Sequence, residues 1–325
     1  MSKRIYLVYN PVAGRGLLTE RIGEITEIFS REGYETIVRA TTAKGDAAML
    51  AETADLSGCD YFVSCGGDGT LDETVSGIMR RIKAPDRENG PDPGSAEGTR
   101  GRSDGRNIVV GYIPAGSTND FAVSLRIPPD PAAAARTVIR GRTYFCDIGG
   151  FNENSYFVYV AAFGLFTEVS YSTPQEMKNL LGHTAYLING IGEMMKLGKM
   201  KPHHIRAEYD GKTIEDDYAV GLVTNARSVG GFAQLAGGNV DLSDGLFEVT
   251  LIKMPRDVAE ATAILGGLIN SDYSTSLMVH FQTESLKITS DSELKWTLDG
   301  EFGGEHKEAV LTNLNRVLRI RVPEE

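Results

Sequence analysis

The stretch that decides the fold is residues 61–70, which read Tyr-Phe-Val-Ser-Cys-Gly-Gly-Asp-Gly-Thr. Its apolar start predicts a buried strand, and a helical pattern follows from Leu71 to Arg81. The glycines between them let backbone N–H groups turn toward one anion with no Cβ in the way. Because Asp68 would repel a phosphate unless a metal or a hydroxyl donor lay beside it, the stretch predicts a nucleotide site with Mg²⁺. The alternative is an ordinary glycine-rich turn between a strand and a helix.

The residues around this stretch alternate predicted strands and helices. Alternation of this kind is typical of a parallel sheet covered by helices, with ligands at the carboxyl ends of the strands. The predicted strands are 5–9, 36–39, 61–65 and 108–113, and the predicted helices are 19–32, 46–54 and 71–81. The segment 84–106 has almost no apolar residue, which predicts a mobile surface insertion.

From about residue 130 the pattern changes to short strands separated by turn signals. Asp210-Gly211 is a strong hairpin signal inside the run 205–214. The further predicted strands are 218–224, 246–253, 279–281, 286–289, 294–298 and 317–322, and the predicted helices are 131–140, 175–197 and 257–269. The sequence therefore predicts an α/β domain followed by a β-rich domain.

Composition excludes several classes of protein. A length of 325 residues suits two domains, and a net charge of −11 argues against a general nucleic-acid binder. Three cysteines without metal-ligand spacing indicate a reducing compartment. No stretch approaches the ~20 apolar residues of a membrane span, and the amino terminus does not resemble a signal peptide. We therefore expect a soluble, cytoplasmic protein, at most attached to a membrane surface.

Two further loops follow predicted parallel strands and resemble the glycine stretch in chemistry. Asn10-Pro-Val-Ala-Gly14 ends the first strand, and Pro114-Ala-Gly-Ser-Thr-Asn-Asp-Phe121 follows the strand 108–113. Because the carboxyl ends of parallel strands meet at one edge, these glycine-and-hydroxyl turns should build a single crevice.

Carboxylates in the second half provide candidates for chemistry. Asp241 and Asp244, with a nearby backbone carbonyl, could hold Mg²⁺ through hard oxygen ligands, although an Asx turn is the simpler interpretation. Asp299 and Glu301 flank a glycine after the strand that holds Trp296. Phosphoryl transfer to a hydroxyl needs a carboxylate to accept the proton, and these two are the best candidates.

Together these motifs resemble the diacylglycerol kinase catalytic family, and most closely its soluble bacterial lipid kinases. The five motifs that carry the resemblance are Asn-Pro-x-x-Gly, Gly-Gly-Asp-Gly-Thr, Pro-x-Gly-Ser-x-Asn-Asp-Phe-Ala, Asp-x-x-Asp-Gly and Asp-Gly-Glu, in this order from Asn10 to Glu301. The family implies a Rossmann-like nucleotide-binding domain (1–128, with 305–325 as a returning strand) and a β-sandwich lipid-substrate domain (129–304), with the active site between them. It also suggests a homodimer.

The resemblance assigns roles to individual residues. Asp299 or Glu301 would be the general base, with Asp299 favoured, and Asp241, Asp244 and the carbonyl of Leu246 would hold Mg²⁺. Asp72 and Ser117 stand where the family more often has Asn and Thr. The residues expected to contact ATP are Asn10, Pro11, Val12, Ala13, Gly14, Thr42, Gly66, Gly67, Asp68, Gly69, Thr70, Leu71, Asp72, Glu73 and Ser117.

The expected activity is transfer of the γ-phosphoryl group of ATP to a hydroxyl of diacylglycerol or a similar lipid. Alternatives are a sphingoid base, phosphatidylglycerol or NAD as acceptor, or a silent protein that binds nucleotide or lipid. The basic, methionine-rich segment 194–206 is a candidate for docking on anionic membrane, with a solvated helix end as the simpler alternative.

Overall fold

The computed structural model describes residues 3–83, 108–164, 202–226, 241–270 and 272–324. The chain forms two compact units, Met1–Cys146 with Leu318–Glu325 (unit 1) and Asp147–Val317 (unit 2). It passes from unit 1 into unit 2 within β5 (Arg142–Phe151) and returns within β13 (Glu301–Val322). The domain limits 1–128 with 305–325, and 129–304, stay a prediction.

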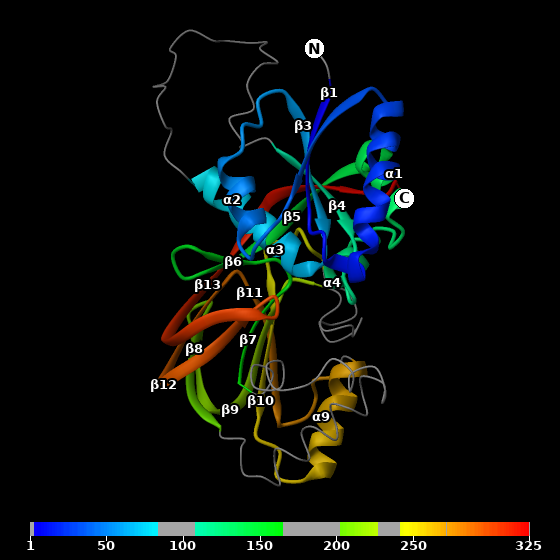
Figure 1. Ribbon diagram of the computed structural model, residues 1–325. Coiled ribbons are helices and arrows are strands. Elements are labelled where there is room, and N and C mark those ends of the chain that lie inside the picture. The colour runs from blue at the N-terminus through cyan, green and yellow to red at the C-terminus, as the bar shows by residue number, and fades with distance from the viewer. Residues whose placement is uncertain (1–2, 84–107, 165–201, 227–240, 271, 325) are drawn as a thin grey trace, which may run out of the picture. The chain divides into compact units, whose positions relative to one another are not determined.

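A parallel sheet organises unit 1 (Figure 1). Its strands are β1 (Lys3–Tyr9), β2 (Tyr34–Ala40), β3 (Cys59–Gly66) and β4 (Val109–Pro114), in the order β2-β1-β3-β4. The inner strands β1, β3 and β4 are largely buried, as continuous apolar runs require. Ile320 of β13 pairs in parallel with Val110 of β4, so β13 joins this sheet.

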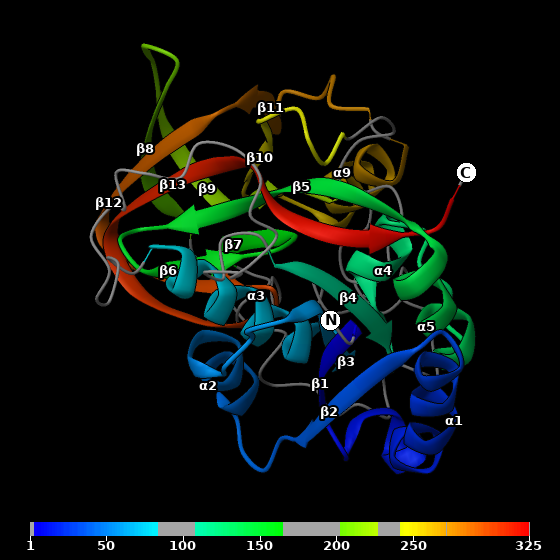
Figure 2. The ribbon, with the colours of Figure 1, turned by 90° about the horizontal axis from the view of Figure 1, so that it is seen from above.

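Helices cover both faces of the sheet because the strand order reverses beside β1. The chain moves from β1 to β2 in one direction and from β2 past β1 to β3 in the other, and right-handed crossovers then put the connecting helices on opposite faces. In Figure 2, α2 (Asp46–Thr53) and α3 (Asp68–Lys83) lie together on one face, and α1 (Leu17–Arg31) lies beside α5 (Pro131–Arg140) on the other. Two shorter elements are the 3-10 turn η1 (Ala13–Gly16) and α4 (Asp120–Ser124).

Unit 2 is built from antiparallel strands. The strands β7 and β8 each pair with both β9 and β12 and lie between them, because β10 takes the other edge of β9 and β13 the other edge of β12. Bounds of the elements are β6 (Ser155–Phe157), β7 (Val160–Gly164), β8 (His203–Tyr209), β9 (Lys212–Thr224), β10 (Phe247–Lys253), α9 (Val258–Asn270), β11 (Met278–Thr283) and β12 (Ser285–Leu298).

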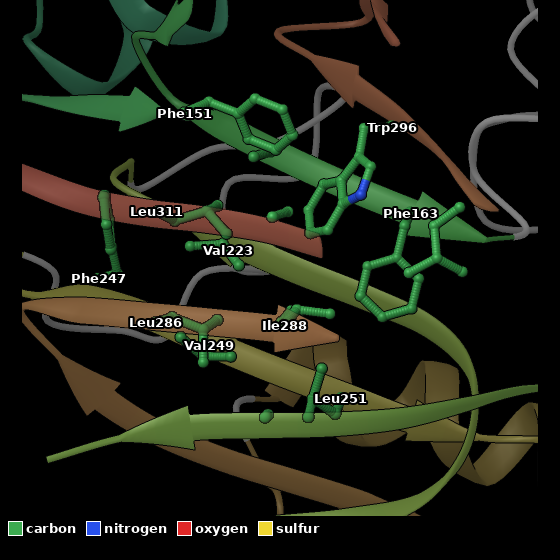
Figure 3. Packing of buried hydrophobic residues seen from close by; sticks show 14 of the residues in the cluster. Phe151, Phe163, Val223, Phe247, Val249, Leu251, Leu286, Ile288, Trp296 and Leu311 are labelled. Carbon is green, nitrogen blue, oxygen red and sulfur yellow. The ribbon is translucent and has the colours of Figure 1, made fainter. Parts of the chain in front are cut away.

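The core of unit 2 is an aromatic and aliphatic cluster centred on the fully buried Trp296 (Figure 3). Phe151 and Phe163 approach its indole ring edge-on, at centroid distances of 5.1 and 5.0 Å. Each fully buried side chain of this size contributes about 1.5–3 kcal/mol through the hydrophobic effect. The cluster therefore gives unit 2 a hydrophobic core of its own.

Most predicted elements are present with small shifts of their ends. The helix expected from Leu71 begins at Asp68, so only Gly67 separates β3 from α3, and Asp68-Gly69-Thr70 belongs to the first turn of the helix. The predicted strands 286–289 and 294–298 are one strand, β12, which is irregular between Thr289 and Leu294. The hairpin at Asp210-Gly211 joins β8 to β9, with positive φ at both residues. The predicted segments 84–106 and 175–197 lie outside the described residues, as does 194–201 of the basic segment.

Among the residues that the structure describes, no helix is both long enough and apolar enough to cross a membrane.

Candidate functional site

The loops predicted to bind a nucleotide follow strand ends at one edge of the unit 1 sheet. The first follows Tyr9 at the end of β1, and the second follows Gly66 at the end of β3. Because β1 and β3 are neighbours at the point where the strand order reverses, their carboxyl ends bound the crevice in which open α/β sheets bind ligands. The loop after Pro114 at the end of β4 lies beside them, since Ala115 N donates to Gly66 O over 2.7 Å.

Glycines let these loops approach until their backbones touch. A Cβ on Gly116 would lie 2.8 Å from Cα of Gly67, and a Cβ on Gly14 would lie 3.0 Å from the carbonyl oxygen of Ala115. At Gly66 a Cβ would lie 2.5 Å from the Thr70 hydroxyl oxygen. Since real Cβ atoms do not come so close, a side chain at Gly116 would force two of the loops apart, and one at Gly66 would displace Thr70. The three predicted loops therefore form one continuous backbone surface.

Side-chain hydrogen bonds fix the loops around this surface. Asn10 Nδ2 donates to the Thr70 hydroxyl over 3.4 Å, and Asn10 Oδ1 accepts from Val12 N over 3.1 Å. Thr74, one turn further along α3, donates to the carbonyl oxygen of Thr70 and contacts Ser64 inside the sheet. Asn10 thus links the end of β1 to the first turn of α3.

Two acidic residues, Asp68 and Asp120, come together where α3 and α4 begin. Asp68 Oδ2 accepts from Asp120 N over 3.2 Å, while Asp68 Oδ1 is buried and has no hydrogen-bond partner among the described residues. Burial, followed by the negative charge of Asp120, raises the pKa of Asp68 to about 6. A carboxyl group whose ionised form is disfavoured by burial and by a neighbouring negative charge is typical of a functional site.

The other residues predicted to contact ATP differ in exposure. Val12 is 78% exposed, and Thr42, Gly69 and Ser117 are also exposed beside the strand ends. Leu71 is buried, so only its backbone could face a ligand. The remaining predicted positions, which are Pro11, Ala13, Asp72 and Glu73, are all partly exposed.

The Asp-Gly-Glu turn lies in unit 2, between β12 and β13. Asp299 is 5% exposed, and its carboxylate accepts three backbone hydrogen bonds, from Val158 N (2.5 Å), Tyr159 N (3.0 Å) and Val160 N (2.9 Å). Glu301, two residues later, is exposed. The two candidate bases therefore differ sharply in their surroundings.

The loop from Asp241 to Leu246, also in unit 2, is shaped by its own carboxylates. Asp241 Oδ1 accepts from the backbone N (3.1 Å) and the hydroxyl (2.9 Å) of Ser243, and Asp244 Oδ1 accepts from Leu246 N over 2.9 Å. Desolvation, followed by the charges of Asp241 and Asp147, raises the pKa of Asp244. No cluster of three or more His, Cys, Asp or Glu side chains suited to a metal is present in the described part of the chain.

Comparison with known proteins agrees with these motifs. The model of the diacylglycerol kinase catalytic domain matches residues 4–150. A diacylglycerol kinase of Bacillus subtilis (strain 168) is 34% identical over 99% of this chain and 97% of its own length. The chain belongs to the diacylglycerol kinase catalytic family.

Other members of the family extend this similarity to the whole chain. A diacylglycerol kinase of Staphylococcus aureus (strain JH9) is 32% identical over 99% of this chain and 93% of its own length. The solved structure of a diacylglycerol kinase from Bacillus anthracis str. Sterne has the same fold, with a TM-score of 0.74 at 20% identity, over 98% of this chain and 96% of that chain. By its family the protein is a kinase.

Sequence reasoning missed a buried carboxylate that organises the acidic loop of this kinase. Asp147 is fully buried and accepts from Gly245 N (2.7 Å), Arg316 N (2.6 Å) and Asn315 Nδ2 (3.0 Å). Desolvation raises its pKa, which the hydrogen bonds partly offset. A charged residue inside the apolar run Phe145–Ile148 was the signal in the sequence, because unpaired carboxylates are rarely buried.

Asn119 shapes the third loop through both its backbone and its side chain. It adopts a left-handed backbone conformation with φ 53°, and its side chain both accepts from Gly116 N and donates to Gly116 O, each over 2.9 Å. These two bonds close the turn that presents Gly116 to Gly67. Asn tolerates a positive φ better than most residues, and its side chain can satisfy a turn in this way.

Proposed function

We propose that this kinase transfers the γ-phosphoryl group of ATP to a hydroxyl of diacylglycerol or a similar lipid. The observation that carries the proposal is the contact of the three glycine loops at the point where strand order reverses in unit 1. Backbone N–H groups in such loops hold phosphates, and the start of α3 adds the positive end of a helix dipole. Phosphoryl transfer depends chiefly on this kind of positioning and charge stabilisation.

Within this proposal, ATP lies against the loops that hold Asn10–Gly14, Gly66–Glu73 and Ser117, with Thr42 beside them. Ser117 is exposed at this edge, and its hydroxyl group can donate to a phosphate oxygen, whereas the Thr42 hydroxyl donates to Asp46 and offers lone pairs to a donor on the nucleotide. The main chain of Gly66 and Gly67 can approach a phosphate closely because neither residue has a side chain. Relatives named diacylglycerol kinase that align over the full chain support a lipid acceptor.

We propose Glu301, in place of Asp299, as the general base. A base must present a lone pair to the substrate hydroxyl within hydrogen-bond reach. The carboxylate of Asp299 is buried and already accepts three backbone N–H groups, whereas Glu301 is exposed. Asp299 would then hold the Asp-Gly-Glu turn in place, and Glu301 would take the proton from the lipid hydroxyl as the phosphoryl group is transferred.

The acidic loop of unit 2 fits a hard divalent cation. Its oxygen donors would be the carboxylates of Asp241 and Asp244 and the carbonyl of Leu246, with water completing the shell, as Mg²⁺ usually requires. The raised pKa of Asp244, caused in part by the charge of Asp241, is the kind of repulsion that a cation relieves. A bound Mg²⁺ would supply positive charge that stiffens this loop, and Asp147 would hold the loop from behind.

The broader predictions belong to the same proposal. We propose that unit 1 is a Rossmann-like nucleotide-binding domain and unit 2 a β-sandwich lipid-substrate domain. We also propose that the protein works in the cytoplasm, touches the inner membrane face to reach its lipid, and forms a homodimer. Relatives of the same length that are named for a lipid substrate support the membrane contact.

The test is transfer of labelled phosphate from γ-labelled ATP, with Mg²⁺, into a panel of micellar lipids separated by chromatography. Labelled phosphatidic acid is the expected product. A different labelled lipid, or labelled NADP, would support the kinase activity and identify another acceptor. If ATP binds and no acceptor is labelled, the lipid kinase proposal is wrong and a silent binding protein is favoured.

A further inference from the structure

Three positions on α3, spaced by four residues, contact the neighbouring helix α2 at its start, middle and end. These are Glu73, Gly77 and Arg81, and residues at this spacing lie on one face of a helix. We call the three residues the α2–α3 clamp. In Figure 2 the two helices lie side by side on one face of the unit 1 sheet.

The start of α2 is capped from α3 and not by its own residues. Gly45 precedes the helix and has no side chain to accept from the first N–H groups, which a helix leaves without intrahelical partners. Glu73 supplies the missing acceptors, because its Oε1 accepts from Gly45 N over 2.8 Å and its Oε2 from Ala47 N over 3.2 Å. Each carboxylate oxygen of Glu73 is therefore engaged by the backbone of α2.

This cap leaves Asp46, the first residue of α2, able to turn back onto the preceding loop. Asp46 Oδ2 accepts from Thr42 N (2.6 Å), the Thr42 hydroxyl (2.7 Å) and Ala43 N (2.9 Å). These hydrogen bonds lower the pKa of Asp46, so the carboxylate is ionised at neutral pH and keeps its hold on Thr42. The position of Thr42 is thus set by α2, and the start of α2 is set by Glu73.

The middle and end of the clamp keep the two helices in fixed register. A Cβ on Gly77 would lie 2.2 Å from the carbonyl oxygen of Ala48, so the helices are in backbone contact there. Arg81 donates to the carbonyl oxygens of Ala51, Glu52 and Ala54, which the end of α2 leaves unpaired. Helix α2 cannot slide along α3 without breaking these contacts.

We propose that Glu73 is a positioning residue, which holds Thr42 at a fixed distance from the glycine loop and so sets the affinity for the nucleotide. The inference rests on the proposed function, because it takes ATP to lie against the start of α3 and Thr42 to contact it. It changes the role expected of Glu73 from direct contact with ATP to action through Thr42. Pre-ordering a binding loop in this way increases affinity by lowering the entropy lost on binding.

The test is calorimetric titration of ATP with Mg²⁺ into the full chain and five variants. Glu73→Ala and Thr42→Ala should each weaken binding about tenfold, and the double variant should be no weaker than the weaker single one within about twofold. Glu73→Gln, which can still accept one N–H, should show a smaller loss. Arg80→Ala is the matched control: it removes an ion pair of 2.9 Å to Glu52 between the same helices, away from Thr42, and should bind ATP like the wild type.

A second readout separates positioning from general loss of stability. Hydrogen exchange at the Thr42 and Ala43 amides should be faster in Glu73→Gln and unchanged in Arg80→Ala, without nucleotide. The inference is wrong, while the proposed function stands, if the losses of ATP affinity in Glu73→Ala and Thr42→Ala multiply in the double variant. It is also wrong if ATP affinity is unchanged in Glu73→Ala. Absence of ATP binding by the wild-type chain would overturn both.

Discussion

Replacing Asp68 with asparagine should stabilise the protein near neutral pH. Burial and the charge of Asp120 raise the pKa of Asp68 from 3.8 to about 6, which means that the folded state favours the protonated acid. Ionisation of this carboxyl therefore opposes folding, and the neutral asparagine removes the opposition. The pKa difference corresponds to at most about 3 kcal/mol of unfolding free energy at neutral pH.

The pH dependence of this effect distinguishes it from a simple packing change. Below the unfolded pKa of 3.8 the carboxyl is protonated in both states, so Asp68 and asparagine should give similar stability. As the pH rises through about 6, the wild-type protein loses the advantage of the protonated folded form, and Asp68→Asn does not. The difference in unfolding free energy between Asp68→Asn and the wild type should thus grow between pH 3.8 and about 6 and stay constant above that range.

Scanning calorimetry at about pH 4 and about pH 7 measures this gap. Calorimetry is preferred because the fluorescence of Trp296, the only tryptophan, reports unit 2, whereas Asp68 lies in unit 1. Asp55→Asn is the matched control: hydrogen bonds from the side chain and then the backbone of Ser57 lower the pKa of that exposed carboxylate, so its removal should not raise stability at neutral pH. Equal stability of Asp68→Asn and wild type at neutral pH, or the same gap at both pH values, would refute the reasoning.

Three further predictions test the loops and the acidic residues. Gly116→Ala should weaken ATP binding on the order of tenfold or more, because its Cβ would lie 2.8 Å from the neighbouring glycine loop. The control for the ATP titration is Gly23→Ala, which places a Cβ with no atom within 4 Å and should only stabilise α1. Glu301→Gln should lower kcat by about 10²–10⁴-fold with little change in melting temperature, while Asp299→Asn should lower the free energy of unfolding by about 1–3 kcal/mol. A large loss of kcat in Asp299→Asn, with normal kcat in Glu301→Gln, would identify Asp299 as the base. Mg²⁺ at about ten times its dissociation constant should stabilise the wild type by about 1.4 kcal/mol and Asp244→Asn by much less, as thermal unfolding without nucleotide would show.

Local sequence determined the α/β half and the loops of the site. Apolar runs such as 5–9, followed by Asn10, and 61–65, followed by Gly66, predicted parallel strands that end in turns, and the strands and helices described in unit 1 follow that pattern. The prediction succeeds because strand burial and turn geometry depend on residues that are adjacent in the chain. The hairpin at Asp210-Gly211 and helix α5, which begins at Pro131 and ends at Arg140, were predicted for the same reason.

Contacts between distant residues were decided only by the tertiary structure. Nothing within the Asp-Gly-Glu motif shows that three N–H groups of residues 158–160 converge on Asp299, about 140 positions away along the chain. Likewise, Glu73 resembles an ordinary acidic residue in the first turns of a helix until α2 is seen to rest on it. A sequence thus determines which local backbone conformations are favourable. Hydrogen bonds between distant residues depend on how the strands and helices pack, and this packing decides which carboxylate accepts backbone N–H groups and which is accessible to solvent.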